Sequence, residues 1–215
     1  MSDLTKRLKQ FALEQGANLV GIASVENLQG IPIDGDVTDI LQDAKNVVVL
    51  AMHLDEEIVE RALMPTYSEK YYDLYDRLKD LGVAVAKFIE DSGYKTVRNS
   101  TIGKPGSFLH KPAAQMAGLG QIGLNTLLIT PEYGNRVQFV TIVTDAPFTA
   151  DEPYSGQLCR KCRKCLSVCP VNAINEGKVD QKLCIPYLFK KKEDGGFNVL
   201  CRECRVVCLA HKNLS

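Results

Sequence analysis

Eight cysteines, all between Cys159 and Cys208, constrain this 215-residue chain more than any other feature of its sequence. The first four lie in the run Cys-Arg-Lys-Cys-Arg-Lys-Cys-Leu-Ser-Val-Cys-Pro, at positions 159–170. Three cysteines spaced three apart can converge on one small inorganic core, whereas the fourth, which precedes Pro170, is carried past it toward a second core. The other four stand at positions 184, 201, 204 and 208. Eight thiolates are what two 4Fe-4S clusters require.

The spacing C-x2-C-x2-C-x3-C-P is typical of bacterial two-cluster ferredoxins, in which the cysteine before the proline serves the other cluster. This rule predicts how the ligands divide. The first cluster is predicted to be held by Cys159, Cys162, Cys165 and Cys208. The second is predicted to be held by Cys169, Cys184, Cys201 and Cys204, which leaves no thiol over.

Two other uses of the cysteines compete with iron–sulfur clusters. A disulfide framework needs an oxidising compartment, but residues 1–50 show no charged and apolar signal segment with a cleavage site. Structural zinc is the better rival, because Cys201 and Cys204 form a C-x2-C pair. A zinc site is usually built from two separated pairs, whereas the cysteines at 159, 162 and 165 overlap as a triplet. Zinc remains the alternative.

A polar connector with two prolines, at residues 145–157, predicts a domain boundary. We expect an α/β cofactor- and substrate-binding domain at residues 1–150 and a two-cluster ferredoxin-like domain at residues 151–215. The hydrophobic content of 45% suffices for a sizeable core. No apolar run approaches the ~20 residues that a membrane-spanning helix needs, so we expect a cytoplasmic protein without membrane contact.

The net charge of zero hides an asymmetry between the two predicted domains. Residues 151–215 carry +5 and residues 1–150 carry −5. Basic residues alternate with the cysteines at positions 160–164 and follow at 190–192. One interpretation is a docking face for an acidic electron donor, such as ferredoxin or flavodoxin, or for RNA phosphate. The other is that the positive charge holds an anionic cluster and tunes its potential.

The first 150 residues alternate between helix and strand patterns. Apolar residues at helical spacing predict a helix from residue 3 to Gly16 and a long helix over residues 68–91. Short helical character is expected at residues 112–117. Strands are predicted at 19–23, 46–52, 94–98, 126–130 and 137–144.

The segment Gly118-Leu-Gly120-Gln-Ile-Gly123 matches the pattern G-x-G-x-x-G. A dinucleotide site needs a strand before these glycines and a helix after them, but here a helix is predicted before and strands after. We therefore reject a Rossmann domain. The glycines still indicate a close backbone approach, to a large flat cofactor or to a neighbouring strand.

Three stretches carry a resemblance to a known family. They are Leu19-Val-Gly-Ile-Ala23, the stretch Tyr72-Asp-Leu-Tyr-Asp-Arg-Leu of the long helix, and the glycine segment at 113–134 followed by Thr144-Asp-Ala-Pro and the cysteine run. In this order they resemble the epoxyqueuosine reductase and reductive dehalogenase family. The resemblance implies an α+β fold, with a nitroreductase-like α/β sandwich domain followed by a small ferredoxin-like domain with two 4Fe-4S clusters. It corresponds to a short form without the helical-repeat domain of epoxyqueuosine reductases.

The resemblance also implies a cobalamin-like corrinoid in the first domain, reduced by electrons that an external donor passes through the clusters. The residues expected to lie against the corrinoid are Gly118, Gly120, Gly123, Asn125, Thr130 and Tyr133. The substrate would be a small molecule, reduced at cobalt.

A proton donor is harder to predict. Epoxyqueuosine reductases carry an aspartate before the glycine segment, but residues 98–106 of this chain contain no carboxylate. The candidates are Tyr72, Lys104 and His110. Each has a competing structural interpretation, because tyrosines at helical spacing are often core residues and a lone histidine beside a helix start is often structural.

Three hypotheses on function follow. The first is an iron–sulfur reductase of this family that acts on a small molecule. The second is an electron-transfer protein that serves a partner enzyme or corrinoid protein, supported by the missing acid and the basic cluster segment. The third, epoxyqueuosine reduction on tRNA, is the least favoured, because the helical repeats that help to hold tRNA do not occur in this sequence.

Overall fold

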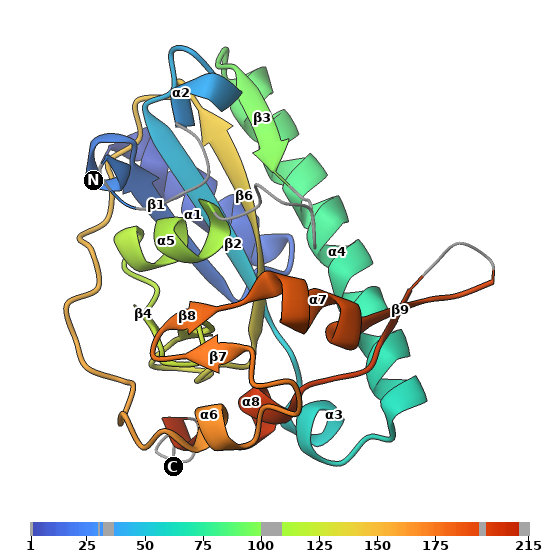
Figure 1. Cartoon of the computed structure of the whole chain (residues 1–215). Helices are drawn as coiled ribbons and strands as arrows, with labels where there is room; N and C mark the ends of the chain where they lie inside the picture. The colour runs from blue at the N-terminus through green and yellow to red at the C-terminus, as the bar shows by residue number, and fades with distance from the viewer. Residues whose placement is uncertain (1, 30, 32–36, 100–108, 194–196, 211–215) are drawn as a thin grey trace. The chain divides into compact units, whose positions relative to one another are not determined.

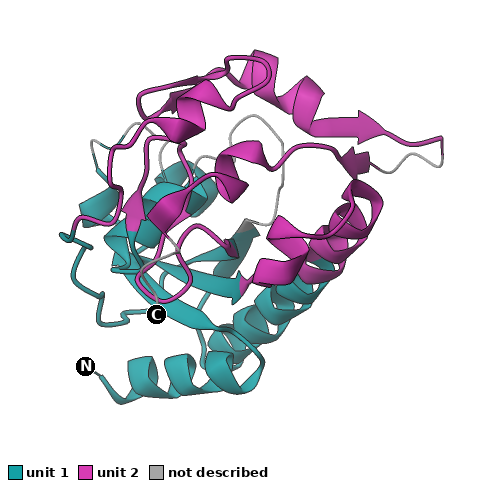
Figure 2. Cartoon of the chain, turned by 90° about the horizontal axis from the view of Figure 1, so that it is seen from below, with its two compact units in different colours: residues 1–52, 76–120, 138–156 teal, residues 53–75, 121–137, 157–215 magenta. Residues whose placement is uncertain are grey.

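The computed structural model describes residues 2–29, 31, 37–99, 109–193 and 197–210. The chain divides into two compact units (Figure 2). Unit 1 contains residues 1–52, 76–120 and 138–156, and unit 2 contains residues 53–75, 121–137 and 157–215. The cysteine segment thus shares its unit with two segments from earlier in the chain. The domain boundary expected near residue 150 stays a prediction.

Unit 1 begins with helix α1 (Asp3–Glu14), as the sequence predicts. The Ser2 hydroxyl caps the helix by accepting a hydrogen bond from the Thr5 amide at 3.3 Å. Gly16 follows the helix with a φ of 100°, a left-handed conformation that favours glycine. Leu8 and Ala12 are fully buried, and Phe11 stacks on Phe88 with ring centroids 4.9 Å apart. The apolar stripe of α1 is therefore packed in the core.

A four-stranded sheet in the order β1-β2-β6-β3 forms the centre of unit 1 (Figure 1). The strands are β1 (Leu19–Ser24), β2 (Asn46–His53), β3 (Thr96–Asn99) and β6 (Val137–Thr144). Strand β1 pairs antiparallel with β2, and β3 pairs antiparallel with β6. The consecutive valines and leucine of β2 predict a strand buried on both faces, and the residues from Asn46 to Met52 are indeed all buried.

Helices cover both faces of β6. A Cβ added to Gly82, on helix α4 (Met64–Asp91), would lie 3.4 Å from the methyl groups of Val140. The next residue, Thr141, shares a 3.0 Å hydrogen bond with His110 of helix α5 (His110–Met116). Because successive side chains of a strand point to opposite faces, α4 and α5 lie on opposite sides of the sheet in unit 1.

The connector at residues 145–157 is fastened to unit 1 by Asp151. Its carboxylate pairs with the Lys9 ammonium at 2.5 Å and accepts a hydrogen bond from the Ile22 amide at 2.8 Å. Two short elements complete the described part of unit 1. They are the 3-10 helix η1 (Glu26–Leu28) and helix α2 (Val37–Ile40).

Unit 2 consists of short elements. Helix α3 (Glu56–Glu60) precedes the first turns of α4, and strand β4 (Gln121–Ile122) pairs with β5 (Leu128–Ile129). The cysteine segment adds helices α6 (Lys164–Ser167), α7 (Gln181–Leu188) and α8 (Glu203–Val206). It also adds two hairpins, β7 (Ile174–Asn175) with β8 (Lys178–Val179) and β9 (Phe189–Lys191) with β10 (Phe197–Val199). Unit 2 must therefore be stabilised by contacts between segments that are distant in sequence, because its helices and strands are short.

The structure confirms a mixed α/β fold and corrects two element predictions. Helix α4 begins at Met64 instead of residue 68, and the strand predicted at 126–130 is reduced to Leu128–Ile129 in the β4–β5 hairpin. The glycine segment follows helix α5 and runs into that hairpin, which agrees with the rejection of a Rossmann domain. In the part of the chain that the structure describes, no helix combines the length and apolar character needed to cross a membrane.

Candidate metal centre

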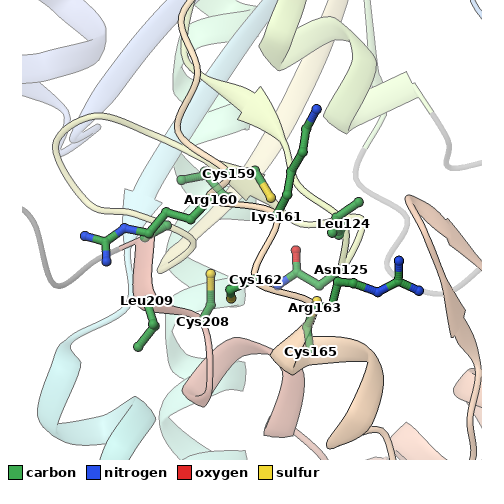
Figure 3. Close-up of a pocket in the computed structure, with 12 residues that line it drawn as sticks. Leu124, Asn125, Cys159, Arg160, Lys161, Cys162, Arg163, Cys165, Cys208 and Leu209 are labelled. Atoms are coloured by element: carbon green, nitrogen blue, oxygen red, sulfur yellow. The ribbon is translucent and has the colours of Figure 1, made fainter.

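Four cysteines from opposite ends of the cysteine segment line one hollow in unit 2 (Figure 3). They are Cys159, Cys162, Cys165 and Cys208. The hollow has about 360 Å³ of empty space, part of it open to solvent. This is the set of residues predicted to hold the first cluster. None of the eight cysteines forms a disulfide, and in the described chain no three His, Cys, Asp or Glu side chains are arranged to hold a single metal ion.

The two residues that flank Cys162 in the loop between Cys159 and Cys165 have an unusual backbone conformation. Lys161 and Arg163 both have positive φ, at 52° and 61°. An alternation of right- and left-handed residues turns successive amide groups toward one concave side, a geometry that suits anions and occurs at Fe–S sites. Such a conformation is uncommon for residues other than glycine, so the loop is held by its surroundings. The Gln121 side-chain oxygen contributes by accepting hydrogen bonds from the Leu158 and Cys159 amides at 2.8 and 2.9 Å.

The thiols of this first group act on one another electrostatically. Burial raises the pKa of Cys165, and Cys208, Cys159 and Cys162 raise it further. Burial also raises the pKa of Cys208, with additional contributions from Cys159 and Cys162. Thiols with raised pKa values are protonated at neutral pH, so they release protons when they bind a metal.

The other four cysteines form a second set of electrostatic neighbours. Burial raises the pKa of Cys204 to about 12, opposed by Arg205 and reinforced by Cys201 and Cys184. Burial likewise raises the pKa of Cys201, and Cys169 adds to this. The Cys169 sulfur accepts a hydrogen bond from the Ala173 amide at 3.2 Å. Cys165 is the one member of the first group that also acts on Cys204.

The segment that carries the last three cysteines, residues 201–208, is held by hydrogen bonds from polar side chains to other parts of unit 2. Asn125 donates to the Cys204 carbonyl at 2.9 Å. Arg202 donates to the Ile58 carbonyl at 2.9 Å and to the Ala62 carbonyl, and its guanidinium lies 4.5 Å from the centre of the Tyr67 ring. These bonds position residues 201–208 against segments that lie some 80 to 140 residues earlier in the chain.

Two buried arginines, Arg136 and Arg205, also connect the cysteine segment to the rest of unit 2. Arg136 is only 2% exposed and pairs with Glu60 at 2.6 Å and, more distantly, with Glu56 at 3.9 Å. Arg205 is 7% exposed and donates to the Asn135 carbonyl, while the Asn135 amide donates to the Arg205 carbonyl at 3.2 Å. Arg136 acts electrostatically on Cys208, and Arg205 on Cys204. Each group of cysteines therefore has one buried guanidinium beside it.

The residues predicted to contact a corrinoid divide between the units. Gly118 and Gly120 belong to unit 1, and the other four belong to unit 2. Gly118 has a φ of 75°, and a Cβ there would lie 2.7 Å from the Glu152 carbonyl, so its neighbour is the polypeptide connector. A Cβ on Gly123 would lie 2.8 Å from the Ile129 side chain, across the β4–β5 hairpin.

The other predicted contacts are engaged within unit 2. Asn125 is buried and lines the cysteine hollow (Figure 3). Thr130 accepts a hydrogen bond from the Tyr133 amide at 2.9 Å and closes the turn to Gly134. The Tyr133 ring stacks on His53 with centroids 4.7 Å apart. Contact of these residues with a corrinoid stays a prediction.

The predicted proton donors have different surroundings. His110, in unit 1, has its pKa lowered to about 4 by burial and by the charge of Lys111. Its imidazole is therefore neutral at pH 7 and a weaker proton donor than an imidazolium. Tyr72, in unit 2, has a pKa raised by burial and packs edge-on against Tyr71 at 6.0 Å. Lys104 lies outside the described residues.

Sequence reasoning missed three side chains that shape this centre: Gln121, Arg136 and Arg205. Gln121 lies inside the glycine motif, where the pattern leaves its position open. Arg136 follows a turn, and Arg205 lies between two cysteines among other basic residues. A guanidinium in a basic segment is normally read as exposed, so local sequence offers no signal that these two are buried.

Comparison with known proteins gives relatives of two kinds. No protein-family model matches the chain. An epoxyqueuosine reductase of Listeria monocytogenes is 37% identical over 122 residues, which is 52% of this chain and 32% of the relative. A tetrachloroethene reductive dehalogenase of Dehalobacter restrictus is 31% identical over 147 residues, 66% of this chain and 25% of the relative. The chain spans half or less of the length of the epoxyqueuosine reductases that it matches first.

A solved structure extends the similarity over nearly the whole chain. It is a reductive dehalogenase whose structure suggests a mechanism for B12-dependent dehalogenation. The match has a TM-score of 0.74 and 24% identity, and it covers 96% of this chain and 32% of that chain. At this level of identity it shows a shared fold.

Proposed function

Because the chain belongs to the epoxyqueuosine reductase and reductive dehalogenase-like family, we propose that it is an oxidoreductase with two 4Fe-4S clusters. It passes single electrons from an external donor through the clusters to a corrinoid, for the reduction of a small molecule. Bound clusters supply one-electron transfer, and a bound corrinoid supplies strongly reducing cobalt chemistry. The share of the polypeptide is to hold, insulate and orient these groups.

The observation that carries the proposal is the grouping of the eight cysteines. Four of them line one hollow. Of the other four, Cys201 and Cys184 act electrostatically on Cys204, and Cys169 acts on Cys201, although Cys165 of the first group also acts on Cys204. The concave backbone around Cys162 suits an anionic core. The donor set is entirely thiolate, which suits iron–sulfur clusters.

The first group of cysteines is the side where electrons would enter. Cys162 is exposed, and so are Arg160, Lys161 and Arg163. Figure 3 shows these three basic side chains extending away from the hollow. A basic rim around an accessible cluster attracts an acidic donor and speeds encounter at low ionic strength. We expect a ferredoxin or flavodoxin to dock there.

The corrinoid is supported by the B12-dependent dehalogenase whose fold this chain shares. The residues that would hold it are those of the glycine segment and the following turn, Gly118, Gly120, Gly123, Asn125, Thr130 and Tyr133. His110 and Tyr72 are the described candidates for delivering a proton, and the pKa of His110 favours a neutral ring.

Anaerobic reconstitution with iron and sulfide, followed by optical and electron paramagnetic resonance spectra with and without cobalamin, tests the proposal. The expected result is about eight irons per chain and a change in the cobalt signal when cobalamin is added. Zinc in place of iron, or a chain that takes up neither metal, would overturn the cluster assignment. Eight irons without any cobalamin or flavin binding would overturn the reductase.

That last outcome would favour the second candidate, an electron-transfer protein that serves another enzyme or corrinoid protein. The exposed basic rim around the first cysteine group supports it. Substrate turnover by the isolated protein, together with failure to retain any partner in a pull-down, would exclude it. Epoxyqueuosine reduction on tRNA is tested by complementing a strain that lacks queuosine.

A further inference from the structure

The two buried arginines of unit 2 differ in how their charge is balanced. Arg136 has a carboxylate partner, because Glu60 lies 2.6 Å away. Arg205 bonds instead to the backbone of Asn135. In the part of the chain that the structure describes, no carboxylate oxygen lies within 4.0 Å of the Arg205 guanidinium. The positive charge of Arg205 is therefore not neutralised by a carboxylate and can act fully on other neighbouring groups.

A guanidinium that is 7% exposed needs a nearby negative charge, because burial of an uncompensated ion is costly. Arg205 acts electrostatically on Tyr67, Tyr71 and Arg136. The two tyrosines are neutral at pH 7, because burial raises the pKa of both, and Arg136 is cationic. Arg205 also directly follows Cys204 of the second group of cysteines in helix α8 and acts electrostatically on it.

We propose that Arg205 is the internal counter-charge of the cluster held by Cys169, Cys184, Cys201 and Cys204, and that it raises the reduction potential of this cluster above that of the first. This inference rests on the proposed function, since it requires both clusters. Four thiolates give a bound cluster net negative charge, and reduction adds one more, so a nearby cation favours the reduced state. Arg136 does less for the first cluster, because Glu60 neutralises it.

The asymmetry gives electron flow a direction. An electron from the external donor would enter at the first group of cysteines, where Cys162 is exposed. It would then pass to the second group, beside Arg205; the first cluster would be oxidised as the second is reduced, and no proton would be consumed. The transfer is downhill when the second cluster has the higher potential, and the charge arrangement around Arg205 and Glu60 provides that order.

The test is a potentiometric titration of the reconstituted protein, followed by electron paramagnetic resonance, in the wild type and in Arg205→Gln. The variant removes the charge and keeps hydrogen-bond donors. We expect the equilibrium constant for reduction of the second cluster to fall about tenfold in Arg205→Gln. This corresponds to a reduction potential lower by about 59 mV for one electron. Arg205→Lys retains the charge and is expected to restore most of the shift.

Glu60→Gln is the complementary variant, and a purely structural role would not produce its effect. Removal of the Glu60 carboxylate leaves the charge of Arg136, beside Cys208, without its partner. The reduction potential of the first cluster should therefore rise, and the equilibrium constant for its reduction should increase about threefold to tenfold. Cys208→Ser is expected to damage only the first cluster, so it identifies which potential belongs to which cluster.

The outcomes separate the inference from the proposed function. If the wild type takes up no iron, the proposed function is wrong, and this result is distinct from a failure of the inference on Arg205. If both clusters form and Arg205→Gln leaves both potentials unchanged, or shifts the two equally, the inference is wrong. The same holds if Arg205→Lys behaves like Arg205→Gln, because the charge would then be irrelevant.

Discussion

Unit 1 and unit 2 are stabilised in different ways. Unit 1 has a sheet with helices on both faces, the long helix α4 on one and the short helix α5 on the other. Its core consists of aliphatic side chains, among them Val47, Val48, Val49, Leu50, Ile142 and Val143, all fully buried. Unit 2 has helices α6 and α8 of only four residues and contains both arginines that are buried in the described chain. Helices this short have no stability of their own.

The difference indicates what each unit needs in order to fold. Burial of aliphatic surface stabilises unit 1 without any ligand. Unit 2 relies on polar clamps and contains thiols whose pKa values are raised by burial and further by neighbouring cysteines. In this respect unit 2 resembles small metal-binding domains, where binding free energy is folding free energy.

The largest expected effect is the loss of structure in unit 2 when the proposed clusters are removed. After chelation of the iron, or in Cys204→Ser, amides of residues 201–208 should lose hydrogen-exchange protection by orders of magnitude, while those of β2 keep theirs. The reason is that β2 lies in the aliphatic core of unit 1. Equal loss of protection in both units would contradict the claim that only unit 2 depends on a bound metal for its stability.

A pH effect is expected to arise in unit 1. The pKa of His110 is lowered from 6.5 to about 4 in the folded state by burial and by Lys111. The unfolded chain therefore binds a proton that the folded chain does not, and stability is complete above pH 6.5 and is lost as the pH falls through 4. The loss is at most about 3 kcal/mol. Denaturant unfolding at several pH values should show this slope in wild type and not in His110→Asn.

Gly21→Ala tests the close packing of unit 1. A Cβ at this position would lie 2.5 Å from the Ala117 carbonyl oxygen, a backbone atom that cannot move aside cheaply. We expect a loss of about 2 kcal/mol in the free energy of unfolding. The matched control is Gly82→Ala, where the new Cβ meets only methyl groups at 3.4 Å and alanine favours the helix. Equal destabilisation by both variants would contradict the packing argument.

Asn125→Ala gives the smallest effect and tests the clamp in unit 2. It removes the hydrogen bond to the Cys204 carbonyl, which should cost about 1 kcal/mol in unfolding of the reconstituted protein and slow iron uptake. Glu132→Ala, at an exposed position in the same segment, should leave both unchanged. A wild-type rate of iron uptake in Asn125→Ala would show that the clamp is dispensable.

Local patterns were sufficient for much of unit 1. The 3.6-residue spacing of apolar residues located α1 and α4, and the run of valines located β2. The short elements of unit 2 were harder, as the strand at 126–130 shows. Two- to four-residue elements carry no periodicity, and their positions depend on contacts with distant segments.

The sequence by itself determined the α/β order of the first segments, the family resemblance and the eight-cysteine pattern, because each depends on residues that are close in sequence. Only the tertiary structure decided that residues 53–75 and 121–137 join the cysteine segment, and that Arg136 and Arg205 are buried beside it. Burial of a charge depends on which distant carbonyls and carboxylates surround it. That environment exists only once the chain has folded.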